Sequence, residues 1–202
     1  MFISLGGNCS IAYQLNKYDL RTHAYPFDWC KINSKQLLQV LKSNFKNFSI
    51  LEFKKYSENH KLIADGTINI NQDINQGINQ DINQDINQGS VILKNKYNIQ
   101  FAHELKRDDE ILEYQNKLSN RIHRFNTLKI PTFIRIETEN LNNDKIKIYQ
   151  NIEIELSKYF DNYKLILISK FKYESEKIVW YPLEFTSDWT YSNLDWETIL
   201  ME

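Results

Sequence analysis

The chain has 202 residues, of which 42% are hydrophobic, and this length and composition suit one domain with its own core. Its net charge of −1 argues against nucleic acid and anionic membranes as partners, because no basic excess is present to bind phosphate groups. No window approaches the ~18 apolar residues of a membrane span, and residues 1–7 lack the cationic start and the apolar length of a secretion signal. We therefore expect a cytoplasmic protein.

The chain has two cysteines, Cys9 and Cys30. Two cysteines in a chain of this length do not make a disulfide framework, and a reducing compartment would keep both as thiols. Each thiol then has to be explained by packing or by chemistry.

A low-complexity repeat of the type INQD/INQG occupies residues 70–89. Its apolar residues recur at every fourth position, which fits neither the period of a strand nor that of a helix, and Asn, Gly and Asp disfavour both. We expect a loop that interrupts the single domain as a neutral expansion. The wider excess of Asn, Ile, Lys and Tyr indicates an AT-rich coding genome.

Outside the repeat, apolar runs typical of strands alternate with segments of helical periodicity. In chain order we expect a strand at 2–5, helices at 9–17 and 34–47, strands at 91–94 and 98–102, a helix from about 108 to 125, a strand at 132–137, a helix at 144–160, strands at 164–169 and 177–183, and a last helix at 194–200. Asn33 and Gln36 form a capping box for the second helix. The strand 164–169 is apolar on both faces, which is typical of the middle of a covered sheet.

This alternation predicts an α/β fold, a single domain with a largely parallel sheet flanked by helices. Sites in such sheets form just beyond the carboxyl ends of the strands. Cys9 follows the first strand, His103 follows 98–102, and Glu137 ends 132–137. If these three strands are parallel members of one sheet, the three side chains can meet.

The chemistry of a thiol, an imidazole and a carboxylate predicts nucleophilic catalysis. A helix N-terminus or a nearby imidazolium lowers the pKa of a cysteine from about 8.5, and Cys9 stands at the start of a predicted helix. His103 would act as the general base, oriented by a carboxylate. Gly7 permits a sharp turn, and the Asn8 amide with nearby backbone N–H groups could hold an oxyanion.

Each of these residues also has a plainer interpretation. Cys9 could be a small buried apolar residue, His103 a solvated loop residue, and Glu137 a solvent-facing strand end. Cys9, Cys30, His23 and His103 could supply zinc ligands, but no metal-binding spacing supports this, so we predict no metal and no cofactor.

Two further charged residues stand in apolar surroundings. Asp28 lies in the aromatic segment 24–29, where it could cap a turn or come close to Cys9. Arg135 lies between apolar residues of a predicted strand, so its charge should be paired, with Asp28 or Glu137 as candidates, or should face a polar site that binds substrate.

Several stretches resemble one known family. ISLGGNCSIAYQL at 3–15, the pair Leu20-Arg21 and YPFDW at 25–29 are similar to the opening of a family of papain-like cysteine peptidases, domain of unknown function 1796. FAHE at 101–104 resembles the family's Phe-x-His-acidic segment, FIR at 133–135 its apolar-apolar-arginine strand, and Trp189 and Trp196 its C-terminal region.

The resemblance implies a nucleophile at Cys9 and a base at His103. It also implies an alternative fold, an α+β papain-like arrangement in which a helical part accompanies an antiparallel barrel. Papain-like enzymes carry an oxyanion glutamine upstream of the cysteine, and Ile3 stands at that position here.

Two functions follow from these residues. The first is a thiol-dependent hydrolase resembling a cysteine peptidase, which acts on a peptide or other acyl substrate through Cys9 and His103, with Glu137 or Asp28 as the orienting carboxylate. The second is a non-catalytic α/β domain that binds an anionic or sugar-like ligand at the GGNC turn, with Arg135 as a binding residue. They differ in whether the Cys9 sulfur is needed.

Overall fold

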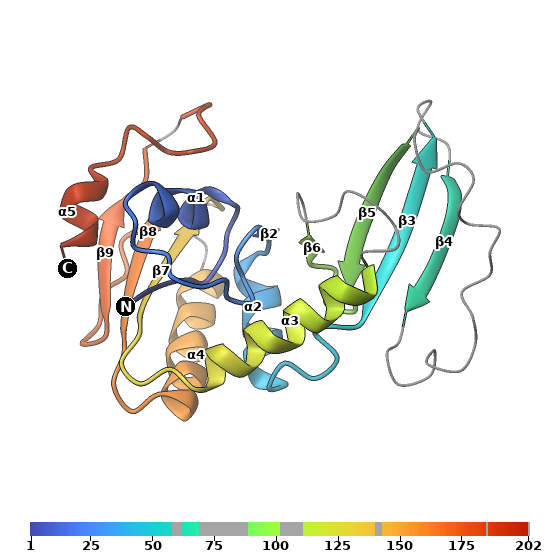
Figure 1. Cartoon of the computed structure of the whole chain (residues 1–202). Coiled ribbons are helices and arrows are strands. Elements are labelled where there is room, and N and C mark those ends of the chain that lie inside the picture. The colour runs from blue at the N-terminus through green and yellow to red at the C-terminus, as the bar shows by residue number, and fades with distance from the viewer. Residues whose placement is uncertain (58–61, 69–88, 102–110, 140–142, 185, 202) are drawn as a thin grey trace.

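The computed structural model describes residues 1–57, 62–68, 89–101, 111–139, 143–184 and 186–201. Most of the predicted repeat and the predicted base His103 therefore lie outside the described residues. Figure 1 shows two sheets toward opposite ends of the molecule, with helices α2 and α3 between them.

A four-stranded parallel sheet forms one part of the molecule. Its order is β1 (Phe2–Ser4), β7 (Thr132–Glu137), β8 (Lys164–Ser169) and β9 (Ile178–Pro182). All three pairings are parallel, and α4 (Asn143–Tyr159) provides the crossover from β7 to β8. The predicted α/β fold with helices flanking a parallel sheet is confirmed, and β8 is buried on both faces as its sequence predicts.

The parallel sheet separates two apolar cores, because successive strand residues point to opposite faces. Phe133 and Leu165 face the larger core, which includes residues of α4, of α2 (Ser34–Lys42) and of α3 (Ile111–Asn126). Ile134 and Ile166 face a smaller core, shared with α1 (Ser10–Lys17) and α5 (Trp196–Leu200). A residue of β7 therefore points toward either α4 or α1, according to its position.

The second sheet has five antiparallel strands. Its order is β2 (Cys30–Lys31), β6 (Gln100–Phe101), β5 (Gly89–Asn95), β3 (Leu51–Ser57) and β4 (Leu62–Ile68). The segments β2, β3 and β4 are not among the strands expected from the sequence. Because β6 pairs with β2 and β5 in this sheet, the prediction that the strand before His103 runs parallel to β1 and β7 is wrong.

Helix α2 begins as predicted but ends early. Asn33 accepts a hydrogen bond from the Gln36 N–H, and the Gln36 side chain accepts one from the Asn33 N–H, which confirms the capping box. The helix ends at Lys42 rather than 47, because Asn44, Phe45 and Asn47 all have positive φ. None of the helices in the described residues is long and apolar enough to span a membrane.

Candidate functional site

The turn between β1 and α1 depends on its two glycines. Gly6 and Gly7 have φ of +75° and +113°, in the region that favours glycine. A Cβ atom on Gly7 would lie 2.3 Å from the carbonyl oxygen of Ile136 in β7. The backbone of the turn is thus held directly against the strand that carries Arg135 and Glu137.

Asn8 and Cys9 connect this turn to α1. The Asn8 Oδ1 atom accepts hydrogen bonds from the Ser10 N–H, at 2.9 Å, and from the Ser10 hydroxyl. Burial raises the pKa of the Tyr191 phenol, and the Asn8 side chain acts in the opposite direction. Cys9 is the N-cap residue of α1, is partly exposed, and its side chain does not cap the helix. Cys9 therefore stands at the end of the helix that carries a partial positive charge.

Cys30 contrasts with Cys9. It is fully buried, and its Sγ donates to the Phe27 carbonyl at 3.2 Å. Burial raises the pKa of Cys30, the charges of Asp28 and Cys9 raise it further, and Arg135 acts in the opposite direction. Cys30 is therefore an inert thiol. The charges of Cys9, Asp28 and Arg135 all act on its pKa.

Asp28 is buried beside the start of β2. Its Oδ2 atom accepts from the Arg21 Nε and from the Tyr25 N–H, each at 3.0 Å. Burial raises the pKa of Asp28 in spite of the Arg21 charge. Both bonds use Oδ2, and among the described residues no donor binds Oδ1. Asp28 thus caps the turn that begins at Tyr25, through Oδ2.

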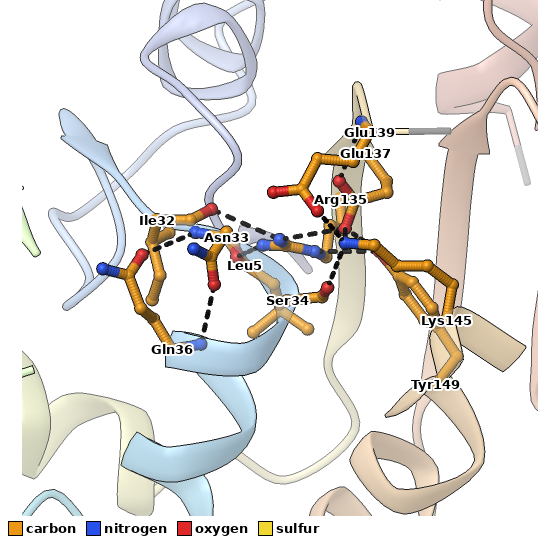
Figure 2. Close-up of polar contacts among 10 residues, drawn as sticks. All are labelled: Leu5, Ile32, Asn33, Ser34, Gln36, Arg135, Glu137, Glu139, Lys145 and Tyr149. Atoms are coloured by element: carbon orange, nitrogen blue, oxygen red, sulfur yellow. Dashed lines mark hydrogen bonds and ion pairs between the residues drawn. The ribbon is translucent and has the colours of Figure 1, made fainter. Parts of the chain in front are cut away.

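Arg135 lies at the centre of a buried polar cluster (Figure 2). Its side chain is 0% exposed, and it donates through Nη1 to the Leu5 carbonyl at 2.8 Å and through Nη2 to the Ile32 carbonyl at 3.2 Å. Its Nε donates to the Tyr149 hydroxyl at 3.0 Å. The guanidinium therefore joins the end of β1, the start of α2 and the middle of α4.

Glu137 completes the cluster as the partner of two cations. Its Oε2 lies 3.6 Å from Arg135 Nη2 and 3.6 Å from Lys145 Nζ, and it accepts from the Tyr149 hydroxyl at 3.2 Å. Burial alone would raise the pKa of Glu137, but the charges of Arg135 and Lys145 outweigh it, so this pKa is lowered. Lys145 also donates to the Ser34 hydroxyl at 2.9 Å and pairs with Glu139.

The predicted site residues fall into separate groups. Gly7, Asn8 and Cys9 lie together at the start of α1, which packs on one face of the parallel sheet. Arg135 and Glu137 contact α4 on the opposite face, so Arg135 pairs with Glu137 rather than with Asp28. Within the described part of the chain no group of three or more metal-ligating side chains occurs.

The sequence did not indicate Lys145 and Tyr149, the residues of α4 that contact Arg135 or Glu137 in this cluster. Lys145 sits in the first turn of a helix and reads in the sequence as an ordinary surface cation, yet it is 3% exposed. One signal was available: a buried arginine and glutamate two residues apart on one strand need further polar partners from the helix that covers them.

Comparison with known proteins identifies a relative and a family. A viral protein named "Uncharacterized protein R408", from Acanthamoeba polyphaga mimivirus, is 27% identical over an alignment that covers 100% of this chain and 97% of that protein. No solved structure matches the chain. The model of the family described as "Putative papain-like cysteine peptidase (DUF1796)" matches residues 1–168, a span that includes the GGNC turn, Asp28, Arg135 and Glu137, and the chain belongs to that family.

Proposed function

We propose that the protein is a thiol-dependent hydrolase that cleaves a peptide or other acyl bond, with Cys9 as its nucleophile and His103 as its general base. The observation that carries this proposal is the placement of a partly exposed thiol at the start of α1, after a turn in which two glycines have positive φ. The contrast with Cys30 supports it, because the second thiol is buried and its pKa is raised.

The reaction would proceed in two stages. His103 takes the thiol proton, the Cys9 sulfur attacks the carbonyl carbon, and the proton passes to the leaving group as an acyl-enzyme forms. Water, deprotonated by His103, then attacks the acyl group and releases Cys9. The Asn8 amide and backbone N–H groups of the Gly7 turn are the proposed donors to the oxyanion.

Asp28 is the orienting carboxylate that we favour. Phe101, two residues before His103, pairs with Cys30, which itself lies two residues after Asp28. Among the described residues both hydrogen bonds to the Asp28 carboxylate use Oδ2, whereas Glu137 contacts Arg135, Tyr149 and Lys145 on the far face of the sheet. Because the Arg135 contacts are buried as well, they do not favour Arg135 as a binding residue for a small ligand.

The test is the pH dependence of Cys9 alkylation by iodoacetamide, with the labelled residue identified by mass. We expect an apparent pKa well below about 8.5 in the wild type, which returns toward that value in His103→Ala and not in the control His123→Ala. Asp28→Asn should shift the profile more than Glu137→Gln. An ordinary thiol pKa that is indifferent to His103 would overturn the proposal.

A further inference from the structure

The face of α1 that continues from Cys9 carries an exposed aromatic pair. Tyr13 lies one helical turn after Cys9, and its N–H donates to the Cys9 carbonyl at 3.1 Å. Residues four apart share a face of a helix. Tyr13 is 37% exposed and stacks edge-on against Trp189, which is 55% exposed, with ring centroids 5.2 Å apart. We call these two rings the aromatic shelf.

The segment that carries Trp189 is held against α1 by the two residues that follow the ring. Gln14, buried in α1, donates through Nε2 to the Thr190 carbonyl at 2.7 Å. Tyr191 packs against the smaller core, to which α1 contributes Ile11 and Leu15. Contacts at three successive residues, 189 to 191, therefore hold the shelf in a fixed place beside the thiol, so little conformational entropy is lost when a ligand binds it.

Asp188, directly before Trp189, stabilises the conformation of this segment and gives it a negative charge. Its carboxylate accepts from the hydroxyl of Thr190 and from the hydroxyl and N–H of Ser192. These bonds lower the pKa of Asp188, so the group stays ionised. An acidic substrate group would be repelled here, and a neutral aromatic or aliphatic group would not.

Resting on the function proposed above, we infer that the aromatic shelf of Tyr13 and Trp189 is a substrate subsite that binds an uncharged aromatic side chain next to the scissile carbonyl. Tyr13 lies one helical turn from the nucleophile and Trp189 packs on it, so a side chain attached beside the bond under attack can extend toward the two rings. Rings that meet edge-on also leave faces on which a third ring can stack.

Two alkylating reagents separate this subsite from the reactivity of the thiol. Iodoacetanilide carries a phenyl ring and iodoacetamide does not, so the ratio of their rates at Cys9, divided by the same ratio for N-acetylcysteine, cancels the nucleophilicity of the sulfur. We expect a normalised ratio of about three to ten in the wild type, in line with the strength of one aromatic contact. It should fall to about one in both Trp189→Ala and Tyr13→Ala.

The controls fix what each result means. Ile154→Ala removes an apolar side chain of matching exposure, 56%, from α4 and should leave the ratio unchanged. A carboxylated iodoacetanilide should react more slowly than the neutral one, and Asp188→Asn should reduce that difference. A ratio near one in the wild type, or a high ratio that survives both shelf substitutions, would overturn the inference. Failure of the proposed function would instead appear as an ordinary pKa with iodoacetamide alone.

Discussion

At the carboxyl edge of the parallel sheet, the functional side chains of one face are buried and those of the other face are exposed. On the α4 face, Arg135, Glu137 and Lys145 are buried and satisfy one another together with Tyr149 and backbone carbonyls. On the α1 face, Cys9 is partly exposed beside exposed rings of Tyr13 and Trp189. Reaction with a substrate requires access, and only the second face provides it.

The difference teaches that a charged residue at a strand end does not by itself indicate a site. Arg135 and Glu137 occupy the edge where α/β sites form, yet both are buried and bind other groups of the fold. Their role is to fix the end of β1 through the Leu5 carbonyl, just before the glycine turn. The buried cluster on the α4 face supports the end of β1, and the α1 face exposes the Cys9 thiol.

The largest effect should come from removing the central cation. Arg135→Met leaves Glu137 buried with less compensation, and breaking a buried pair typically costs about 3–5 kcal/mol. We expect that loss in the free energy of unfolding measured by urea denaturation. Lys117→Met, which removes an exposed cation paired with the exposed Glu113, should cost less than about 1 kcal/mol. Equal losses in the two variants would contradict the contrast between buried and exposed charge.

A smaller effect is expected from the glycine turn that joins the two faces. Gly7→Ala places a Cβ 2.3 Å from the Ile136 carbonyl oxygen, at a φ of +113°. Strain of this kind costs about 1–3 kcal/mol. Because the turn also positions Cys9, the pH profile of alkylation should change as well. A variant with wild-type stability and profile would show that the turn adapts and does not position the thiol.

Much of the parallel sheet could be predicted from the sequence, because its signals are local. The apolar run at 164–169, the capping box at Asn33 and the helical stripe at 144–160 each identify an element without reference to the rest of the chain. The pairing of β6 could not be predicted in the same way. A strand of two residues, Gln100–Phe101, carries no sign of which sheet it joins.

The candidate site was predictable in part for a similar reason. Glycines before a cysteine at a strand-to-helix junction are a local pattern, and the structure explains both glycines. The tertiary partners are different in kind. Trp189 and Tyr13 are in contact although their separation in sequence gives no hint of it. For Glu137 the sequence indicates a polar partner from the covering helix but does not identify it as Lys145.

The smallest expected effect separates the two buried carboxylates by the sign of their pH dependence. The pKa of Glu137 is lowered, so the stability it contributes is present above about pH 4.3, its unfolded value, and is lost as the pH falls through its folded pKa. The pKa of Asp28 is raised, so its contribution is present below about pH 3.9 and is lost as the pH rises through its folded pKa.

Urea midpoints measured from about pH 3 to 7 should resolve this difference, since each unit of pKa shift corresponds to about 1.4 kcal/mol. The stability of the wild type minus that of Glu137→Gln should grow with pH, because the cations of the α4 face favour the charged carboxylate. The stability of the wild type minus that of Asp28→Asn should shrink with pH, because burial disfavours the charge despite Arg21. Two differences that both shrink with pH would mean that burial governs both carboxylates, and two that both grow would mean that the nearby cations govern both. Either outcome would contradict the distinction between the two.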